Sequence, residues 1–288
     1  MSTVHDAAVR VVADPFFLDA PGGRLFAVHH RPADASSVRG HVLVVPPFNE
    51  EMNRCRSMVT LQAAAFARLG YGALVIDLHG TGDSAGEHGD ARWPLWVDGL
   101  RAAHAWLAQR PGGCRAILGT RLGAILAAQF HAQLARSDIA LILWQPVVDG
   151  KTHLTQFLRV RMAAQLDRAD VPKESTASMR KQLDAGESIE VAGYEIHPQL
   201  ARSIDEAQLA DAPLRSGTAI LWLENAAGDA TELAPPSRKV LDAWAAAGLA
   251  VDAATYAGPA FWQVHERVVT PSIVERTTQW FRDKVAAR

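Results

Sequence analysis

The sequence has few cysteines, no long apolar run and no excess of either charge. Its 288 residues include two cysteines, Cys55 and Cys114, which are too few for a disulfide framework and lack the spacing of a zinc site. Free thiols fit a reducing compartment. The formal net charge of -2 provides no basic surface for nucleic acid and no polybasic membrane patch. We therefore expect no nucleic-acid partner.

Targeting signals and cofactor motifs are also missing. The first residues mix His5, Asp6, Arg10 and Asp14 with apolar ones, so they contain no uninterrupted apolar core of a secretory signal. No apolar stretch reaches the roughly 20 residues of a membrane-spanning helix. Metal-ligand spacings, phosphate loops and dinucleotide fingerprints do not occur. We expect a soluble, cytoplasmic protein with no metal and no cofactor.

Short apolar runs alternate with longer segments of helical periodicity. The apolar runs cover residues 41–47, 72–78, 114–119, 139–146 and 218–225, and the helical segments cover 58–70, 93–113 and 122–136. Runs of this kind are typical of strands buried on both faces of a parallel sheet. The alternation predicts a doubly wound α/β fold with a mostly parallel sheet.

The alternation breaks at residues 149–215, which are more charged and helical in their first part. We interpret this segment as a small helical lid inserted over the carboxyl edge of the sheet. A surface subdomain with no role in access to a pocket fits the same pattern. The predicted core then consists of residues 1–148 and 216–288.

The stretch AILGTRLGAILAA reads as a buried strand, a tight turn and a helix, with Gly119, Arg121 and Gly123 around the turn. A sharp strand-to-helix turn needs small residues two positions before and after its centre, because larger side chains would collide with the neighbouring strand and helix. The two glycines meet this need with Arg121 at the centre. Centring the turn on Thr120 would put leucines at both flanks, so we place the centre at Arg121.

These segments resemble the α/β-hydrolase superfamily over nearly the whole chain. VIDLHGTGDSAGE (75–87) is similar to its segment after the fourth strand, with His79 in place of an arginine, and VVPPFNEEMNRCR (44–56) stands where its oxyanion loop belongs. AILGTRLGAILAA falls at the nucleophile elbow, which usually carries a serine. Arg121 takes that place, and a guanidinium does not deprotonate in proteins, so it cannot attack a carbonyl.

A literal Gly-x-Ser-x-Gly pattern surrounds Ser84 and matches the Gly-Asp-Ser-Ala-Gly form of hormone-sensitive-lipase-like esterases. The strand before it ends near Leu78, and the residues after it include Gly89 and Pro94 without apolar periodicity. The helix of an elbow is therefore absent. We interpret Ser84 as a turn residue whose hydroxyl satisfies backbone groups.

Two further positions match the superfamily's acid and histidine. Asp229 follows the strand that ends near Glu224, and His265 follows the final strand, in the superfamily's order of elbow, acid and histidine. The resemblance implies a catalytic hydrogen bond between Asp229 and His265. Because the chain has eleven histidines, His265 as a solvated loop residue is the alternative.

Arg121 allows two interpretations. The amino end of the following helix attracts anions, and arginine binds a carboxylate or phosphate with two parallel hydrogen bonds. Alternatively Glu50 or Glu51, in the neighbouring loop, pairs with Arg121 as a structural ion pair. The polar cluster NEEMNR, which starts at Asn49, is the second candidate part of the site.

Two functions follow from this site. In the first, a hydrolase of an ester, thioester or amide uses a water activated by His265 and oriented by Arg121 and the Leu122 N–H, while the loop near Phe48 completes the oxyanion site. In the second, the chain is a non-catalytic pseudo-enzyme that holds an anionic ligand or partner at Arg121.

A closer resemblance rests on PPFNEEMNRCR, GTRLGA, WQPVVDGKTHLTQFLR and GPAFWQ. These segments are similar to the exosortase-A-system-associated hydrolase type 2 group of Gram-negative bacteria. The resemblance implies a bacterial protein that works near exopolysaccharide synthesis, with a small-molecule or saccharide-derived ligand.

Overall fold

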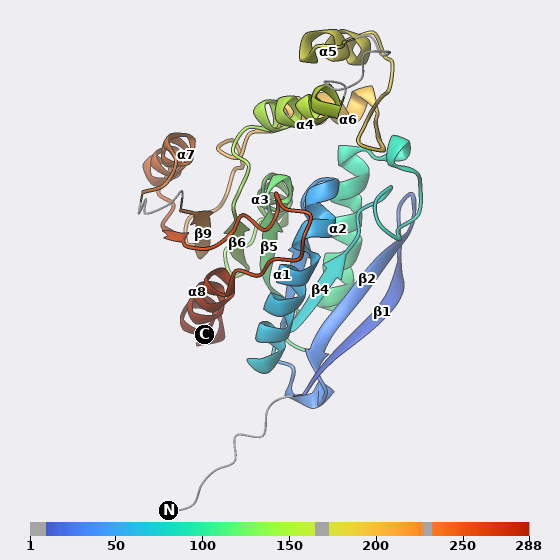
Figure 1. Cartoon of the computed structure of the whole chain (residues 1–288). Coiled ribbons are helices and arrows are strands. Elements are labelled where there is room, and N and C mark those ends of the chain that lie inside the picture. The colour runs from blue at the N-terminus through green and yellow to red at the C-terminus, as the bar shows by residue number, and fades with distance from the viewer. Residues whose placement is uncertain (1–9, 165–172, 227–231, 288) are drawn as a thin grey trace, which may run out of the picture.

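The computed structural model describes residues 10–164, 173–226 and 232–287 (Figure 1). The strands of the main sheet are β1 (Val11–Ala20), β2 (Gly23–Pro32), β3 (His41–Val45), β4 (Gly72–Ile76), β5 (Cys114–Thr120), β6 (Ala140–Trp144), β9 (Ile220–Asn225) and β10 (Val251–Tyr256). The helices beside the sheet are α1 (Glu50–Arg68), α2 (Trp93–Ala108), α3 (Leu122–Leu134), α7 (Pro235–Ala246) and α8 (Pro271–Phe281).

The eight strands follow the order β1-β2-β4-β3-β5-β6-β9-β10. β2 pairs antiparallel with β1 and β4, and the other neighbouring strands are parallel. The predicted doubly wound α/β fold with a mostly parallel sheet is confirmed. Strands β3 and β6 are buried along their whole length, and β5 is buried except at the half-buried Arg115, which explains their largely apolar sequences.

The antiparallel strands β1 and β2 were not predicted from the sequence. Their residues alternate between exposed, half-buried and buried positions, and the sequence mixes His, Arg and Asp among apolar residues. Strands that expose one face to solvent have no continuous apolar run. The apolar runs in the sequence therefore identified only the buried strands.

Each face of the sheet has its own apolar core. Side chains of α1 and α8 pack with one face around Phe66, Trp144 and Phe281. On the other face, α2 and α3 pack around Leu100, Ile125 and neighbouring residues. This sandwich fixes the carboxyl ends of β3 and β5 side by side, because the two strands are neighbours in the sheet.

Helix α1 begins eight residues earlier than the sequence predicted, at Glu50 rather than at residue 58. The prediction that Glu50 and Glu51 lie in a loop was wrong. Pro46 and Pro47 stop the strand before them, and the two carboxylates lie in the first turn of the helix, where the helix dipole favours negative charge. The polar first turns of α1 concealed the helix from an apolar-periodicity argument.

Residues between β6 and β9 form helices α4 (Gly150–Ala164), α5 (Thr176–Asp184) and α6 (Pro198–Glu206) and a hairpin of β7 (Ile189–Val191) and β8 (Tyr194–Ile196). Figure 1 shows α4, α5 and α6 above the end of the sheet at which α1 begins. Among the helices of the described residues, none has the length and apolar composition to cross a membrane.

The turn between β5 and α3 depends on its two glycines. A Cβ on Gly119 would lie 2.6 Å from Gly123 O and 2.7 Å from the Ala124 Cα. A Cβ on Gly123 would collide with the Pro46 carbonyl and lie 2.9 Å from Val45 O. Backbone atoms cannot rotate away, so this turn and the β3–α1 turn lie against each other only if residue 123 has no side chain.

Gly123→Ala should therefore lower the free energy of unfolding by about 3 kcal/mol, at the upper end of overpacking costs. The control is Gly217→Ala, because a Cβ there meets nothing within 4 Å and only a φ of +83° opposes it; a loss of about 1 kcal/mol is expected. Urea unfolding measures both variants. Equal losses in the two variants would contradict the close approach at Gly123.

Two buried histidines make stability depend on pH. The rings of His29 and His41 lie 5.1 Å apart, and burial lowers the pKa of His29 to about 3 and the pKa of His41 to about 4, from a usual 6.5. As pH falls below 6.5, the unfolded chain takes up these protons first, so the free energy of unfolding decreases towards pH 4. His41→Asn should flatten this decrease in urea titrations, and an unchanged slope would show that His41 stays charged when folded.

Candidate functional site

Arg121 lies at the sharp turn between β5 and α3 in a strained backbone conformation, with φ 56° and ψ -124°. Its N–H donates to Trp144 O at 3.0 Å, and its carbonyl accepts from Ala124 N at 3.0 Å. A side-chain-bearing residue in this region costs on the order of 1–3 kcal/mol. The geometry is that of a strand-to-helix elbow, and an arginine occupies its tip.

The Arg121 side chain is paired with Glu51. Its Nε and Nη2 donate to Glu51 Oε1 at 3.1 and 3.0 Å, and its Nη1 donates to Gln145 O at 3.3 Å. The two side chains of the pair are 14% and 18% exposed. The guanidinium also lies 5.3 Å from the centre of the Trp262 ring. Of the two partners that the sequence left open, Glu51 takes the ion pair.

Asn49 repeats the elbow conformation on the adjacent strand. Its φ of 51° and ψ of -127° match those of Arg121, and it stands between β3 and α1 as Arg121 stands between β5 and α3. The buried Asn49 Oδ1 lies 2.6 Å from His88 Nε2. Two strained turns on neighbouring strands therefore form the floor of the site, and residues 50 and 51 follow directly on one of them.

A cavity of about 310 Å³ adjoins Arg121. Its walls come from the α1 and α3 ends of the core, from α4 and from the β7–β8 turn. The lining residues are Phe48, Glu50, Glu51, Arg54, Arg121, His153, Gln156, Phe157, Val160, Ala192 and Gln263. None of these residues carries a hydroxyl or a thiol. The cavity thus offers carboxylates, guanidiniums, amides, an imidazole and aromatic rings.

Several polar atoms of the lining residues are buried without a hydrogen-bond partner. They are Glu51 Oε2, Arg54 Nε and His153 Nε2. Burial lowers the pKa of His153 to about 4, so this imidazole is neutral near pH 7. These atoms have almost no accessible surface, so they lie behind the cavity wall, and leaving each of them unpaired costs about 1–3 kcal/mol.

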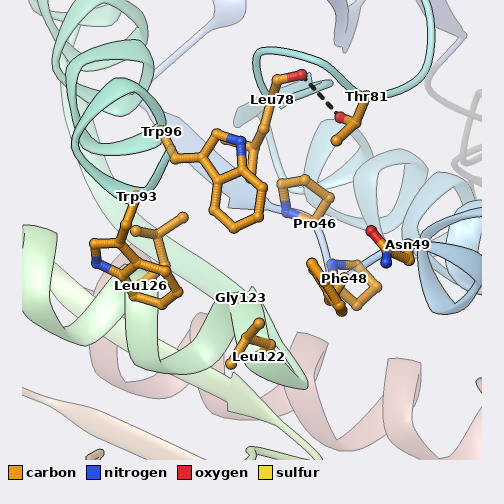
Figure 2. A pocket seen from close by; sticks show the side chains of 11 residues that line it. Pro46, Phe48, Asn49, Leu78, Thr81, Trp93, Trp96, Leu122, Gly123 and Leu126 are labelled. Atoms are coloured by element: carbon orange, nitrogen blue, oxygen red, sulfur yellow. Dashed lines mark hydrogen bonds between the residues drawn. The ribbon is translucent and has the colours of Figure 1, made fainter. Parts of the chain in front are cut away.

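A smaller apolar hollow lies on the other side of Phe48 (Figure 2). Trp93 and Trp96 of α2 point into it towards Leu126 and the Pro46 ring, and Leu122 and Gly123 close it. Its volume of about 10 Å³ barely holds one water. Large side chains fill this hollow, so of the two spaces beside Phe48 the cavity next to Arg121 is the one with room for a ligand.

His265 and Asp229 were expected to complete a triad. His265 is exposed, and Arg54 Nη2 donates to its Nε2 at 3.2 Å. Arg54 Nη1 is also held by the Gln263 carbonyl at 3.2 Å. Asp229 lies outside the described residues. The structure thus brings His265 to Arg54 at the mouth of the site, with its Nε2 lone pair engaged.

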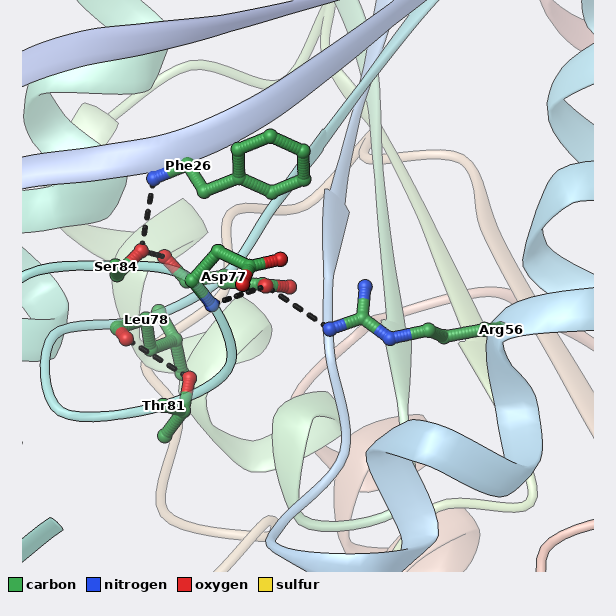
Figure 3. Close-up of polar contacts among 7 residues, drawn as sticks. Phe26, Arg56, Asp77, Leu78, Thr81 and Ser84 are labelled. Carbon is green, nitrogen blue, oxygen red and sulfur yellow. Dashed lines mark hydrogen bonds and ion pairs between the residues drawn. The ribbon is translucent and has the colours of Figure 1, made fainter.

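Ser84 has both hydrogen-bonding capacities of its hydroxyl used by the backbone (Figure 3). Its Oγ accepts from Phe26 N at 2.9 Å and donates to Asp77 O at 2.7 Å. The Asp77 carboxylate accepts in turn from Arg56 Nη2 at 2.9 Å. These bonds tie the β4 turn to β2, which is the turn role expected for this serine.

Among the remaining predicted site residues, Thr120, Leu122 and Phe48 are buried and Glu50 is half-buried. Thr120 is fully buried at the end of β5, and its Oγ1 has no partner. Leu122 and Phe48 are 2% and 5% exposed. Glu50 Oε1 accepts from Tyr194 OH at 2.9 Å, which links α1 to the hairpin. Arg121, Glu51, Glu50 and Phe48 therefore meet at one cavity, whereas Thr120 does not reach it.

Sequence reasoning missed His153 and Phe157, which α4 contributes to the cavity. The periodicity of their segment predicts a helix. It does not predict which residues of that helix face a site formed by other parts of the chain. Gln145 was missed for a similar reason, because its backbone carbonyl, not its side chain, holds Arg121.

Comparisons with known proteins agree with this architecture. The structure of Est1E from Butyrivibrio proteoclasticus with bound ferulic acid is similar, with a TM-score of 0.66, 15% identity, and coverage of 95% of this chain and all of that one. A thermostable carboxyl esterase from Bacillus coagulans in complex with glycerol has a TM-score of 0.62, 14% identity, and coverage of 95% and 98%. Among curated proteins, none matches.

The profile of the serine aminopeptidase S33 family matches residues 36–197. That range is more than half of the chain and contains the elbow at Arg121, the β4 turn and the residues of α1 that line the cavity. The chain belongs to the serine aminopeptidase S33 family, with the α/β-hydrolase fold.

Proposed function

We propose that this chain is a binding protein built on a hydrolase fold, and that it holds a small ligand in the cavity beside Arg121 without forming an acyl-enzyme. One observation carries the proposal: a guanidinium fixed by Glu51 occupies the elbow, and the adjoining cavity is lined by no hydroxyl or thiol. A serine-type mechanism needs a nucleophile at this position with a base in hydrogen-bonding reach.

Other potential nucleophiles are out of reach. Cys55 is fully buried, and burial raises the pKa of its thiol well above the usual range, which removes the reactive thiolate. Thr120 is equally buried. The Ser84 hydroxyl is held by two backbone groups. These environments support binding over nucleophilic catalysis.

The water-based hydrolysis considered from the sequence has weak geometric support. A general base needs a free lone pair within hydrogen-bonding reach of the water. His265 Nε2 instead accepts from Arg54 Nη2. Glu51, the carboxylate nearest to Arg121, is held in an ion pair with that arginine. His265 and Glu51 therefore each contact an arginine side chain, Arg54 and Arg121 respectively.

We further propose that the segment 149–215 acts as a lid over the cavity. His153 and Phe157 of α4 and Ala192 of the hairpin turn line the cavity. The Tyr194–Glu50 hydrogen bond and the 2.7 Å contact of His88 Nδ1 with Glu195 O join the hairpin to the core. Entry of a ligand would require these few contacts to open.

The resemblance to the exosortase-associated group supports a bacterial, cytoplasmic setting near exopolysaccharide synthesis, and with it a saccharide-derived ligand. The cavity volume of about 310 Å³ is at the lower end of small-molecule pockets, which fits a compact ligand such as a sugar unit. An anionic ligand held directly by Arg121 has less support, because Glu51 already occupies two of its donors.

The absence of an acyl-enzyme is tested with a fluorophosphonate probe and a series of p-nitrophenyl esters. The wild-type protein should show neither a covalent adduct in intact-mass spectra nor ester turnover above the buffer rate. Arg121→Ser should also stay inactive, because His265 remains turned towards Arg54.

Peptide mapping of any adduct, with Ser84→Ala as the matched control, identifies the labelled residue. An adduct on a serine or threonine of the wild-type protein, together with ester turnover, would overturn the proposed function.

A further inference from the structure

A second cavity, called here the Arg110 cavity, lies at the opposite end of the sheet from Arg121. Its volume is about 530 Å³. His41, the first residue of β3, lines it, whereas Arg121 follows the last residue of the parallel strand β5. Among the described residues, none lines both cavities. We propose that the Arg110 cavity binds the carboxylate or phosphate group of a small organic molecule, with Arg110 Nε and Nη2 as the recognition atoms. This site is independent of the function proposed above.

Trp106 of α2 holds the Arg110 side chain in place. Arg110 Nη1 donates to the Trp106 carbonyl at 2.6 Å, and the guanidinium lies over the Trp106 ring. The Trp106 ring is in turn stacked on Phe16 of β1, with ring centroids 4.9 Å apart. A guanidinium held in this way loses little conformational freedom when it binds an anion, because its planar set of donors is already oriented.

The Nε and Nη2 atoms of Arg110 have no hydrogen-bond partner in the described part of the chain. Neither atom is enclosed by protein, and Arg110 is half-buried at the cavity wall, so both donors can reach a ligand. Arginine binds carboxylates and phosphates through two donors at once. Arg136 uses these two atoms on Asp138. Arg121 uses the same two atoms on Glu51. Arg110 therefore presents to the cavity the pair of donors that this chain uses elsewhere to bind carboxylates.

The Arg110 cavity carries more positive than negative charge. Two arginines, Arg31 and Arg110, line it together with one carboxylate, Asp14. Arg31 Nε donates to Asp14 Oδ2 at 2.8 Å, so this carboxylate already has its counterion. Arg110 forms no ion pair with any residue that the structure describes. A ligand anion would supply the missing counterion, and a ligand cation would be repelled by both arginines.

Two buried histidines that line the cavity respond to the charge of Arg110. Burial lowers the pKa of His29 to about 3 and the pKa of His41 to about 4, and the positive charge of Arg110 contributes to both shifts. Both imidazoles are therefore neutral near pH 7 and add no charge to the cavity. The positive charge of Arg110 acts on its surroundings without compensation, and a bound oxyanion would compensate it.

The other walls of the Arg110 cavity are apolar. Phe16, Val38 and Pro111 line it beside the charged groups. Small-molecule sites usually have volumes of roughly 300–1,000 Å³ and combine apolar walls with a few polar groups. An inorganic ion alone would leave most of this volume to water. The size and the walls therefore favour an organic acid or a phosphate ester, whose carbon skeleton packs against the apolar residues.

The experiment measures the affinities of benzoate, phenyl phosphate and benzamide for the full chain at neutral pH, by calorimetry and saturation-transfer NMR. Benzamide has nearly the shape of benzoate and carries no charge. At least one of the two anions should bind about ten-fold more tightly than benzamide, the equivalent of the charge-assisted hydrogen bonds to Arg110. The anion that binds more tightly identifies the preferred group, carboxylate or phosphate, and either preference supports the inference.

Variants of Arg110 locate the binding. Arg110→Gln removes the charge and the paired donors, and should weaken the bound anion about ten-fold without changing the affinity for benzamide. Arg110→Lys keeps the charge without the paired donors and should give an intermediate affinity. The control Arg68→Gln makes the same change of charge at an exposed position of α1 and should leave every affinity unchanged. Circular dichroism checks that each variant is folded.

Three results would overturn the inference: no binding of either anion, anions that bind no more tightly than benzamide, or an anion affinity that Arg110→Gln leaves unchanged. These results are distinct from a failure of the binding function proposed for the cavity beside Arg121. An anion bound in that cavity would lose affinity in Arg121→Met and keep it in Arg110→Gln.

Discussion

The ion pair between Arg121 and Glu51 is the interaction on which the site depends. The elbow of the fold holds Arg121 at φ 56° at the carboxyl end of β5. Its permanently charged side chain is only 14% exposed and therefore needs a counterion. Glu51 provides it because α1 begins at residue 50, directly after the second strained turn at Asn49. The two turns are in contact at Gly123 and the Pro46 carbonyl. The position of the β3–α1 turn therefore determines where Glu51 lies relative to Arg121.

The fold of this chain and the chemistry of its site are separate questions. Membership of the serine aminopeptidase S33 family and likeness to esterase structures describe the fold, whereas the chemistry of a site comes from its own side chains. Here the turn has its two glycines with Arg121 between them, and the adjoining cavity is lined by polar groups and aromatic rings. The binding function proposed above rests on these side chains and not on the family.

The sequence predicted the parts that have a local physical signature. Gly119 and Gly123 identified the elbow, buried apolar runs identified the parallel strands, and Ser84 was correctly assigned to a turn. The start of α1 was not predicted because its first turns are polar. Strands β1 and β2 were not predicted because one of their faces is exposed to solvent. The partner of Arg121 remained open between two adjacent glutamates, since only the helical phase of α1 decides which of them faces the elbow. The contributions of His153 and Gln145 depend on segments distant in sequence, and no local pattern reports such contacts.

A double-mutant cycle on Arg121 and Glu51 tests the central claim most directly. It consists of urea unfolding of the wild type, Arg121→Met, Glu51→Gln and the double variant. Because the side chains are 14% and 18% exposed and joined by two charge-assisted hydrogen bonds, the account predicts a favourable coupling of about 1–3 kcal/mol. A coupling free energy of zero would contradict it, because Arg121 would then stand at the elbow independently of Glu51.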